Sequence, residues 1–367
     1  MYNPKKNIIT ILLLLSLGMS IFTFYVYSES EPRISAKSAA LYEPRSGRFI
    51  YTKEHRASRG MASTTKIMTA ILALENLSLD KIIEAKDENC GIEGSSIYLT
   101  PGERMSAEDL IYALILQSAN DAAATLATEI SGSLEDFSCL MNEKARELSL
   151  SDTHYENPHG LDSENHYTSA RDLVLLTSYA LNNPKFKEIT SKRRHTAESS
   201  LKTRVLVNHN KLLKSYEGCI GVKTGYTKKT GRSLVSAAER DSLTLICATL
   251  DAPDDWNDHR VLLDYGYSSL EARILANACE YSYTLPVLSG KENSVTVSNK
   301  DELIKVINRT GKMVEAKVQL PRFLIAPLNK NTPVGKIIFY LGERQIASLD
   351  LYPENNVEKK KERFSFL

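Results

Sequence analysis

The strongest constraint on the fold is that strand patterns lie at both ends of a helix-rich region. Residues 38–54 read as two strand-like runs that flank a turn at residues 44–47. From residue 219 to residue 250, "CIGVKTGYT", "GRSLVSAA" and "LTLICATL" are β-rich runs. Amphipathic helical patterns, such as residues 168–183, fill the space between. A sheet that draws strands from both ends of this region predicts an α+β domain.

The N-terminus predicts export. Lys5 and Lys6 precede residues 8–27, which carry no charge. A basic start followed by an apolar run is typical of a secretion signal, and about 20 apolar residues also suffice to cross a bilayer. We therefore expect residues 1–30 to be a signal peptide or a membrane anchor. Either alternative places the rest of the chain outside the cytoplasmic membrane, secreted or membrane-attached.

Composition narrows the function. The formal net charge is +1, which does not favour nucleic-acid binding. The five cysteines form no C-x-x-C pair and are expected to be mostly buried small hydrophobic residues. The seven histidines form no H-E-x-x-H motif, so we expect neither a metal nor another cofactor.

A second change of pattern occurs near residue 275, where short alternating runs begin. We expect a catalytic domain over residues 31–273 and a small β-rich domain over residues 276–352. Residues 353–367 are basic and then aromatic. This tail is expected to be a solvated end, with contact with a membrane surface as the alternative.

Three short motifs carry the chemistry. Ser63 and Lys66 form S-x-x-K at the head of an apolar helix, where positions i and i+3 share a face. The simpler alternative is that Ser63 caps the helix and Lys66 extends to water. Ser118, Ala119 and Asn120 form S-x-N, and the chain reads K-T-G at residues 223–225.

The contexts of these motifs make the set specific, although each is weak alone. Ser106 is expected to cap the helix before S-x-N, and Asn120 or Asp121 the helix after it, so the motif lies in an interhelical turn. The K-T-G motif lies on a strand. A serine hydroxyl needs a base, and no histidine is near Ser63 in the sequence. Lys66 is one turn away, and burial or a second cation would lower its pKa enough for it to act as that base.

The chain resembles the serine D-alanyl-D-alanine carboxypeptidases, the low-molecular-mass penicillin-binding proteins. The resemblance covers nearly all of residues 35–270, including "ASTTKIMTAILALE", "GSSIYLTPGERMSAEDLIYALILQSANDAA", "NPHGLDSENHYTSARDLVLLTSYAL" and "GCIGVKTGYTKKTGRSLVSAAERDSLTLI". It implies a β-lactamase/transpeptidase-like α+β domain, with an antiparallel sheet flanked by helices and a helical subdomain, followed by a small all-β domain.

The same resemblance implies an enzyme that removes the terminal D-alanine from peptidoglycan pentapeptide stems. The reaction would pass through an acyl-enzyme on Ser63, and β-lactam antibiotics such as penicillins would acylate the same residue. Lys66 would be the general base, with Lys223 on the facing strand as the second positive charge. Ser118 would relay the proton to the leaving amine, and Asn120 would hold Lys66 or the substrate peptide.

The K-T-G strand would bind the substrate. Lys223 and Thr224 are expected to address its terminal carboxylate, and Gly225 to leave the strand edge clear for an extended peptide. The backbone N–H groups of Ser63 and Tyr226 would form the oxyanion hole.

The sequence also departs from the family. Ala119 replaces an aspartate, and His209 lies where some members carry an arginine, which leaves Arg260 as the nearest downstream candidate for carboxylate binding. The short C-terminal tail makes a retained N-terminal segment the alternative membrane attachment.

Two other functions remain open at this point. One is a β-lactamase, although Glu156 and Glu164 do not fit a deacylation motif. The other is a non-catalytic β-lactam sensor or cell-wall scaffold, which the three intact motifs argue against.

Overall fold

The structure is a computed structural model that describes residues 31–361. The N-terminal segment expected to be a signal peptide or an anchor lies outside this range. Within residues 31–361, no helix combines the length and the apolar character needed to cross a membrane.

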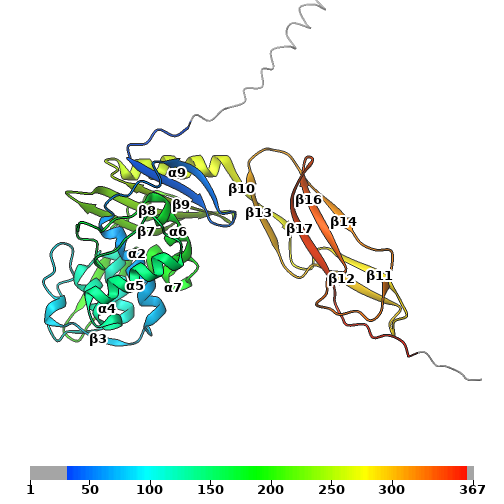
Figure 1. Ribbon diagram of the computed structural model, residues 1–367, viewed down its shortest axis with the longest axis horizontal. Helices are drawn as coiled ribbons and strands as arrows, with labels where there is room; N and C mark the ends of the chain where they lie inside the picture. The colour runs from blue at the N-terminus through cyan, green and yellow to red at the C-terminus, as the bar shows by residue number, and fades with distance from the viewer. Residues whose placement is uncertain (1–30, 362–367) are drawn as a thin grey trace, which may run out of the picture. The chain divides into compact units, whose positions relative to one another are not determined.

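A five-stranded antiparallel sheet organises the first domain (Figure 1). Its strand order, β2-β1-β9-β8-β7, places the N-terminal hairpin beside the strands from the far end of the domain. The expectation that the sheet needs both ends of the region is therefore confirmed. The strands are β1 (Ser38–Glu43), β2 (Arg48–Lys53), β7 (Cys219–Thr227), β8 (Gly231–Arg240) and β9 (Leu243–Leu250).

The alternating strand residues explain why helices cover both faces of this sheet. Ala40 and Tyr42 belong to a core cluster on one face, whereas Ala39 and Leu41 belong to a second cluster on the other. Figure 1 shows α9 on one side and α2, α4 and α5 on the opposite side. The helices are α2 (Lys66–Asn76), α3 (Ala107–Leu116), α4 (Asn120–Ser131), α5 (Leu134–Glu147), α6 (Ala170–Leu181), α7 (Pro184–Ser191), α8 (Leu212–Ser215) and α9 (Asp255–Ser269).

Short elements complete this domain. Two hairpins flank the helical part, and two 3-10 turns connect its segments. They are η1 (Ala62–Thr65), β3 (Ile82–Glu84), η2 (Asp87–Asn89), β4 (Arg104–Ser106), β5 (Arg194–Glu198) and β6 (Thr203–Val207).

Helix caps confirm part of the sequence analysis. The Ser106 hydroxyl accepts a hydrogen bond from the Asp109 backbone N–H, as expected of a cap on α3. The expectation that Asn120 or Asp121 caps α4 is wrong, because Ala119 is the N-cap and the helix begins at Asn120. The Asn120 side chain instead makes long-range contacts in the candidate site.

The β-rich part of the chain follows α9 (Figure 1). Strand β10 pairs with β13, and six further strands form a sheet of order β14-β16-β17-β12-β11-β15. A transpeptidase-like α+β domain followed by a β-rich domain is thus the fold, as expected. The strands are β10 (Leu270–Ala276), β11 (Ser282–Leu288), β12 (Ser294–Ser298), β13 (Leu303–Asn308), β14 (Val314–Gln319), β15 (Leu324–Ile325), β16 (Gly335–Leu341) and β17 (Arg344–Pro353).

Two smaller expectations are corrected. The described part of the tail is not a frayed end, because Val357 is buried and bridges Leu328 in the β-rich domain. Of the cysteines, Cys247 is buried as expected, but Cys139 and Cys279 are exposed.

Candidate active site

The candidate nucleophile lies on a tight turn. Ser63 is part of the 3-10 turn η1, and Lys66 is the first residue of α2. The Nζ atom of Lys66 donates a hydrogen bond of 2.9 Å to the Ser63 hydroxyl oxygen. Neither this turn nor α2 has a side-chain cap, so the alternative that Ser63 caps the helix is wrong.

Lys66 is completely buried, so the alternative that it extends to water is also wrong. Besides Ser63, its Nζ donates to the Asn120 side-chain oxygen at 2.7 Å and to the His159 carbonyl oxygen at 2.5 Å. An amide or carbonyl oxygen only accepts hydrogen bonds. The amine is therefore fixed by two obligate acceptors and directs its third position at Ser63.

Burial and charge both act on the two lysines. Burial and the charge of Lys223 lower the pKa of Lys66 well below that of an ordinary lysine, although Asp121 partly opposes this. Lys223, on β7, is 1% exposed, and burial lowers its pKa to about 7. The site thus holds two amines that lose their protons far more readily than surface lysines do.

Ser118 and Asn120 border the same space from the turn between α3 and α4. Ser118 has a positive φ of 60°, and its buried hydroxyl has no hydrogen-bond partner among the described residues. The Asn120 backbone N–H donates to the Ser95 carbonyl oxygen, and its side-chain amide donates to that of Glu93. These bonds join the S-x-N turn to the loop before it.

Strand β7 forms the opposite wall. It is an edge strand of the sheet, paired with β8 on one side only. A Cβ atom at Gly225 would lie 3.1 Å from the backbone nitrogen of Ser63. Glycine at this position therefore lets the strand approach the turn that carries the nucleophile, a more specific reason than a clear strand edge.

A cleft of about 310 Å³ lies between these walls. It brings together four residues of the three sequence motifs and the adjacent Tyr226, while Lys66, Asn120 and Lys223 lie buried behind its surface. Its lining comprises Ser63, Ser95, Ser118, His209, Thr224, Gly225, Tyr226, Arg232, Asp255 and Trp256.

Arg232, Asp255 and Trp256 are cleft residues that the sequence analysis missed. Arg232 lies directly opposite Tyr226 across the β7–β8 hairpin, and its Nη1 is 3.9 Å from an Asp255 carboxylate oxygen. Burial raises the pKa of Asp255, and the Arg232 charge partly opposes this. The arginine considered from the sequence, Arg260, is exposed on α9 and does not line the cleft. Arg232 could have been found from the sequence, because the expected β-hairpin between the K-T-G strand and the next strand places it opposite Tyr226.

The sequence analysis also missed a supporting loop, which contains Pro158, Gly160 and His166. This loop packs against η1 and α2, and side-chain hydrogen bonds hold it there. The Thr65 hydroxyl pairs with the His166 ring at 2.8 Å, and the Thr69 hydroxyl donates to the Pro158 carbonyl oxygen at 2.6 Å. At Gly160, with φ of 89°, a Cβ would lie 1.9 Å from the Ala62 carbonyl oxygen. These contacts position the carbonyl group that receives the Lys66 hydrogen bond.

Serine enzymes that pair S-x-x-K with S-x-N and K-T-G on an α+β fold form one broad class, the penicillin-binding proteins and their β-lactamase relatives. The fold and site geometry place this chain in that class.

Comparisons with known proteins narrow the class. Residues 25–254 match the family model for D-alanyl-D-alanine carboxypeptidase, and residues 277–359 match that for the C-terminal domain of penicillin-binding protein 5. The D-alanyl-D-alanine carboxypeptidase DacF of Bacillus subtilis is 30% identical over 345 residues, which cover 90% of this chain and 88% of that protein. DacC of Escherichia coli is 30% identical over 347 residues, covering 89% of this chain and 86% of that protein. The crystal structure of penicillin-binding protein 5 from Haemophilus influenzae superposes with a TM-score of 0.70 at 28% identity, covering 90% of this chain and 99% of that one.

The chain therefore belongs to the family of serine-type D-alanyl-D-alanine carboxypeptidases and carries a penicillin-binding protein 5 C-terminal domain. The carboxypeptidase function expected from the sequence is confirmed. The β-lactamase and non-catalytic alternatives are set aside.

Proposed function

We propose that Ser63 attacks the carbonyl carbon between the two D-alanines of a peptidoglycan stem peptide, with neutral Lys66 as the base. The supporting observation is the Lys66 hydrogen-bond set. Its two carbonyl acceptors hold both N–H bonds of a neutral amine, so the lone pair faces the Ser63 hydroxyl at 2.9 Å. Desolvation and the second lysine favour this neutral form at physiological pH.

The proton then has to reach the leaving D-alanine amine. Ser118 suits this transfer, because its hydroxyl lines the cleft and has no partner within residues 31–361. The C–N bond breaks, D-alanine leaves with the proton, and the remaining peptide is an ester on Ser63. Water then hydrolyses the ester and regenerates the serine.

The oxyanion is proposed to accept hydrogen bonds from the backbone N–H groups of Ser63 and Tyr226. The close approach of β7 at Gly225 to the Ser63 nitrogen supports this arrangement. Loss of one such donor costs on the order of 10²–10³ in rate.

The substrate peptide is proposed to lie along the free edge of β7 as an added strand. Its terminal carboxylate would bind the Thr224 hydroxyl and the guanidinium of Arg232. Lys223 is buried and donates to the Thr224 carbonyl oxygen at 3.0 Å, so its charge acts from behind the strand. Arg232 is the cleft residue with an exposed cation.

The cellular setting is proposed from the same evidence of family and sequence. The protein would act outside the cytoplasmic membrane on peptidoglycan, and β-lactam antibiotics would acylate Ser63. Residues 1–30 would direct export and, if retained, attach the protein to the membrane surface.

Two measurements on the purified protein test the proposal. Incubation with penicillin should give a mass adduct that is absent from Ser63→Ala. A peptide ending in D-alanyl-D-alanine should release free D-alanine with the wild type and not with Lys66→Arg, because an arginine keeps its proton. A stable adduct without D-alanine release would refute carboxypeptidase action and favour a sensor.

A further inference from the structure

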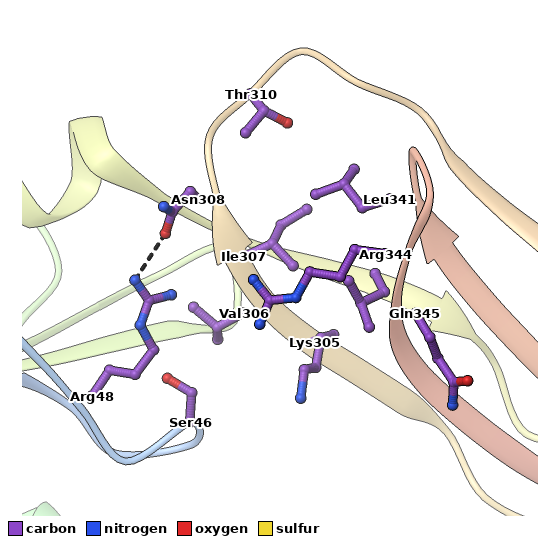
Figure 2. Close-up of a pocket in the computed structure, with 11 residues that line it drawn as sticks. Ser46, Arg48, Lys305, Val306, Ile307, Asn308, Thr310, Leu341, Arg344 and Gln345 are labelled. Carbon is purple, nitrogen blue, oxygen red and sulfur yellow. Dashed lines mark hydrogen bonds between the residues drawn. The ribbon is translucent and has the colours of Figure 1, made fainter. Parts of the chain in front are cut away.

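A second cavity, unrelated to the cleft, lies where β13 runs between two hairpin turns. It has a volume of about 610 Å³ and shares no lining residue with the Ser63 cleft. The β1–β2 turn supplies one wall, and the β16–β17 turn supplies another (Figure 2). The lining residues are Ser46, Arg48, Lys305, Val306, Ile307, Asn308, Thr310, Leu341, Arg344, Gln345 and Ile346.

The charge of this cavity is entirely positive. Arg48, Lys305 and Arg344 line it, and none of the eleven described lining residues is an aspartate or a glutamate. Within residues 31–361, none of the three cations makes an ion pair. Figure 2 shows the Arg344 guanidinium extending from its turn toward β13, with Arg48 on the other side of the cavity.

The floor of the cavity is well anchored. Val306 of β13 belongs to the same core cluster as Leu41 of the five-stranded sheet and Leu270 of β10. Arg48 also donates a hydrogen bond of 2.8 Å to the Asn308 side-chain oxygen. The cations therefore project from a floor and walls that the fold already holds, which reduces the entropy lost when a ligand binds.

We propose that this cavity binds a phosphodiester group of a linear anionic polymer. Two guanidinium groups present paired N–H donors that match phosphate oxygens, and a phosphodiester keeps its negative charge at every physiological pH. The apolar part of the lining, formed by Val306 and Ile307 of the floor and by Leu341 of one wall, suits the carbon atoms that link successive phosphates. The volume exceeds that of one phosphate and leaves space for these linkers.

The cavity shape favours a polymer over a membrane surface. A bilayer is flat on this scale and contacts protruding basic and apolar side chains together. Here the cations surround a hollow, which a flexible chain can enter. Such a site would hold the carboxypeptidase near a polymer of the cell envelope without involving the catalytic groups.

The test is binding of a short glycerol-phosphate oligomer to the full-length protein by isothermal titration calorimetry at two salt concentrations. The triple variant R48Q/K305Q/R344Q should bind at least about tenfold more weakly and lose most of the salt dependence. A matched variant, K317Q/R322Q/K336Q, removes three exposed cations of the β-rich domain that do not line the cavity and should bind like the wild type.

Two further controls keep the outcome interpretable. N308A removes the bond to Arg48 but keeps all three cations, and it should retain binding. All variants should keep the wild-type rate of D-alanine release and melting temperature. Absence of binding, equal loss in both triple variants, or binding to phosphatidylglycerol vesicles but not to the oligomer would each overturn the proposal.

Discussion

Arg232 offers the sharpest test of substrate recognition, because it supplies an exposed cation in the cleft and has a carboxylate as its neighbour. We predict that Arg232→Gln raises KM for a peptide ending in D-alanyl-D-alanine while changing kcat little. We also predict the opposite effect for Asp255→Asn, because that change removes an anion that competes with the substrate for Arg232.

The structure sets the size of both effects. Arg232 Nη1 and Asp255 Oδ2 are 3.9 Å apart, and the Arg232 side chain is 46% exposed. Unit charges at that distance attract by about 1 kcal/mol in water and by about 4 kcal/mol in a medium of dielectric constant 20. Solvent exposure favours the lower value. Asp255→Asn should therefore lower KM by about two- to fivefold, whereas loss of a charge-assisted hydrogen bond in Arg232→Gln should raise it about tenfold.

The assay compares two substrates that differ only at the terminus, a free carboxylate and a carboxamide. The wild type should prefer the acid in kcat/KM, and Arg232→Gln should lose this preference while hydrolysing the amide normally. Arg260→Gln is the matched control, because Arg260 is exposed outside the cleft. An equal loss on both substrates, or an unchanged preference for the acid, would refute carboxylate recognition by Arg232.

Three further predictions concern the supporting structure. Because burial and the charge of Lys223 lower the pKa of Lys66 well below its ordinary value, the rate of penicillin acylation should level off at a lower pH than titration of an ordinary lysine at about pH 10.4 would give. A rate that still rises at about pH 10 would contradict this. Burial would raise the pKa of Glu103, but hydrogen bonds dominated by Arg204 hold it at about 2. The stability that the Glu103–Arg204 pair contributes is therefore lost as pH falls from about 4.5 toward 2. Arg204→Ala should lower the free energy of unfolding, measured in urea at pH 7, by about 3–5 kcal/mol, because it leaves the buried Glu103 carboxylate unpaired. Gly160→Ala should lower the melting temperature and slow acylation, because its positive φ and the contact with the Ala62 carbonyl oxygen together cost about 1–3 kcal/mol. A wild-type melting curve for Gly160→Ala would contradict the close packing of this loop.

The sequence predicted the parts of the fold that depend on local periodicity. Period-two alternation in residues 38–54 and 219–250 predicted the strands. The pairing of strands from both ends of the region in one sheet followed from their positions in the sequence. The N-cap of α4 could not be predicted in this way. Asn120 is a favoured capping residue, but tertiary contacts with Lys66 and the loop at Glu93 take its side chain away from that role.

The candidate site also has a part that the sequence predicts and a part that it does not. The three motifs have local signatures, so their positions on a turn, an interhelical connection and a strand were predictable. Arg232 and Asp255 are 23 residues apart in sequence and meet only because β8 begins near the start of α9. The carbonyl of His159 is a backbone group, and residue identity does not reveal its role toward Lys66.

Burial of the site lysines lowers the free energy of unfolding, and this loss can be measured. Burial lowers the pKa of Lys223 from 10.5 to about 7, so in the unfolded chain this amine holds a proton that the folded protein gives up between those values. The contribution of Lys223 to the unfolding free energy should therefore rise with pH across that range, by an amount on the order of 5 kcal/mol. Lys223→Met, which fills similar volume without a charge, should be more stable than the wild type at pH 7 and should lose most of this slope, while acylation by penicillin falls. Urea unfolding at pH 7 and at about pH 9 measures both slopes, and Lys317→Met, at an exposed position, serves as the control. Equal slopes in the wild type and Lys223→Met would mean that Lys223 keeps an ordinary pKa in the folded protein, and the burial-lowered pKa of this residue would then be refuted.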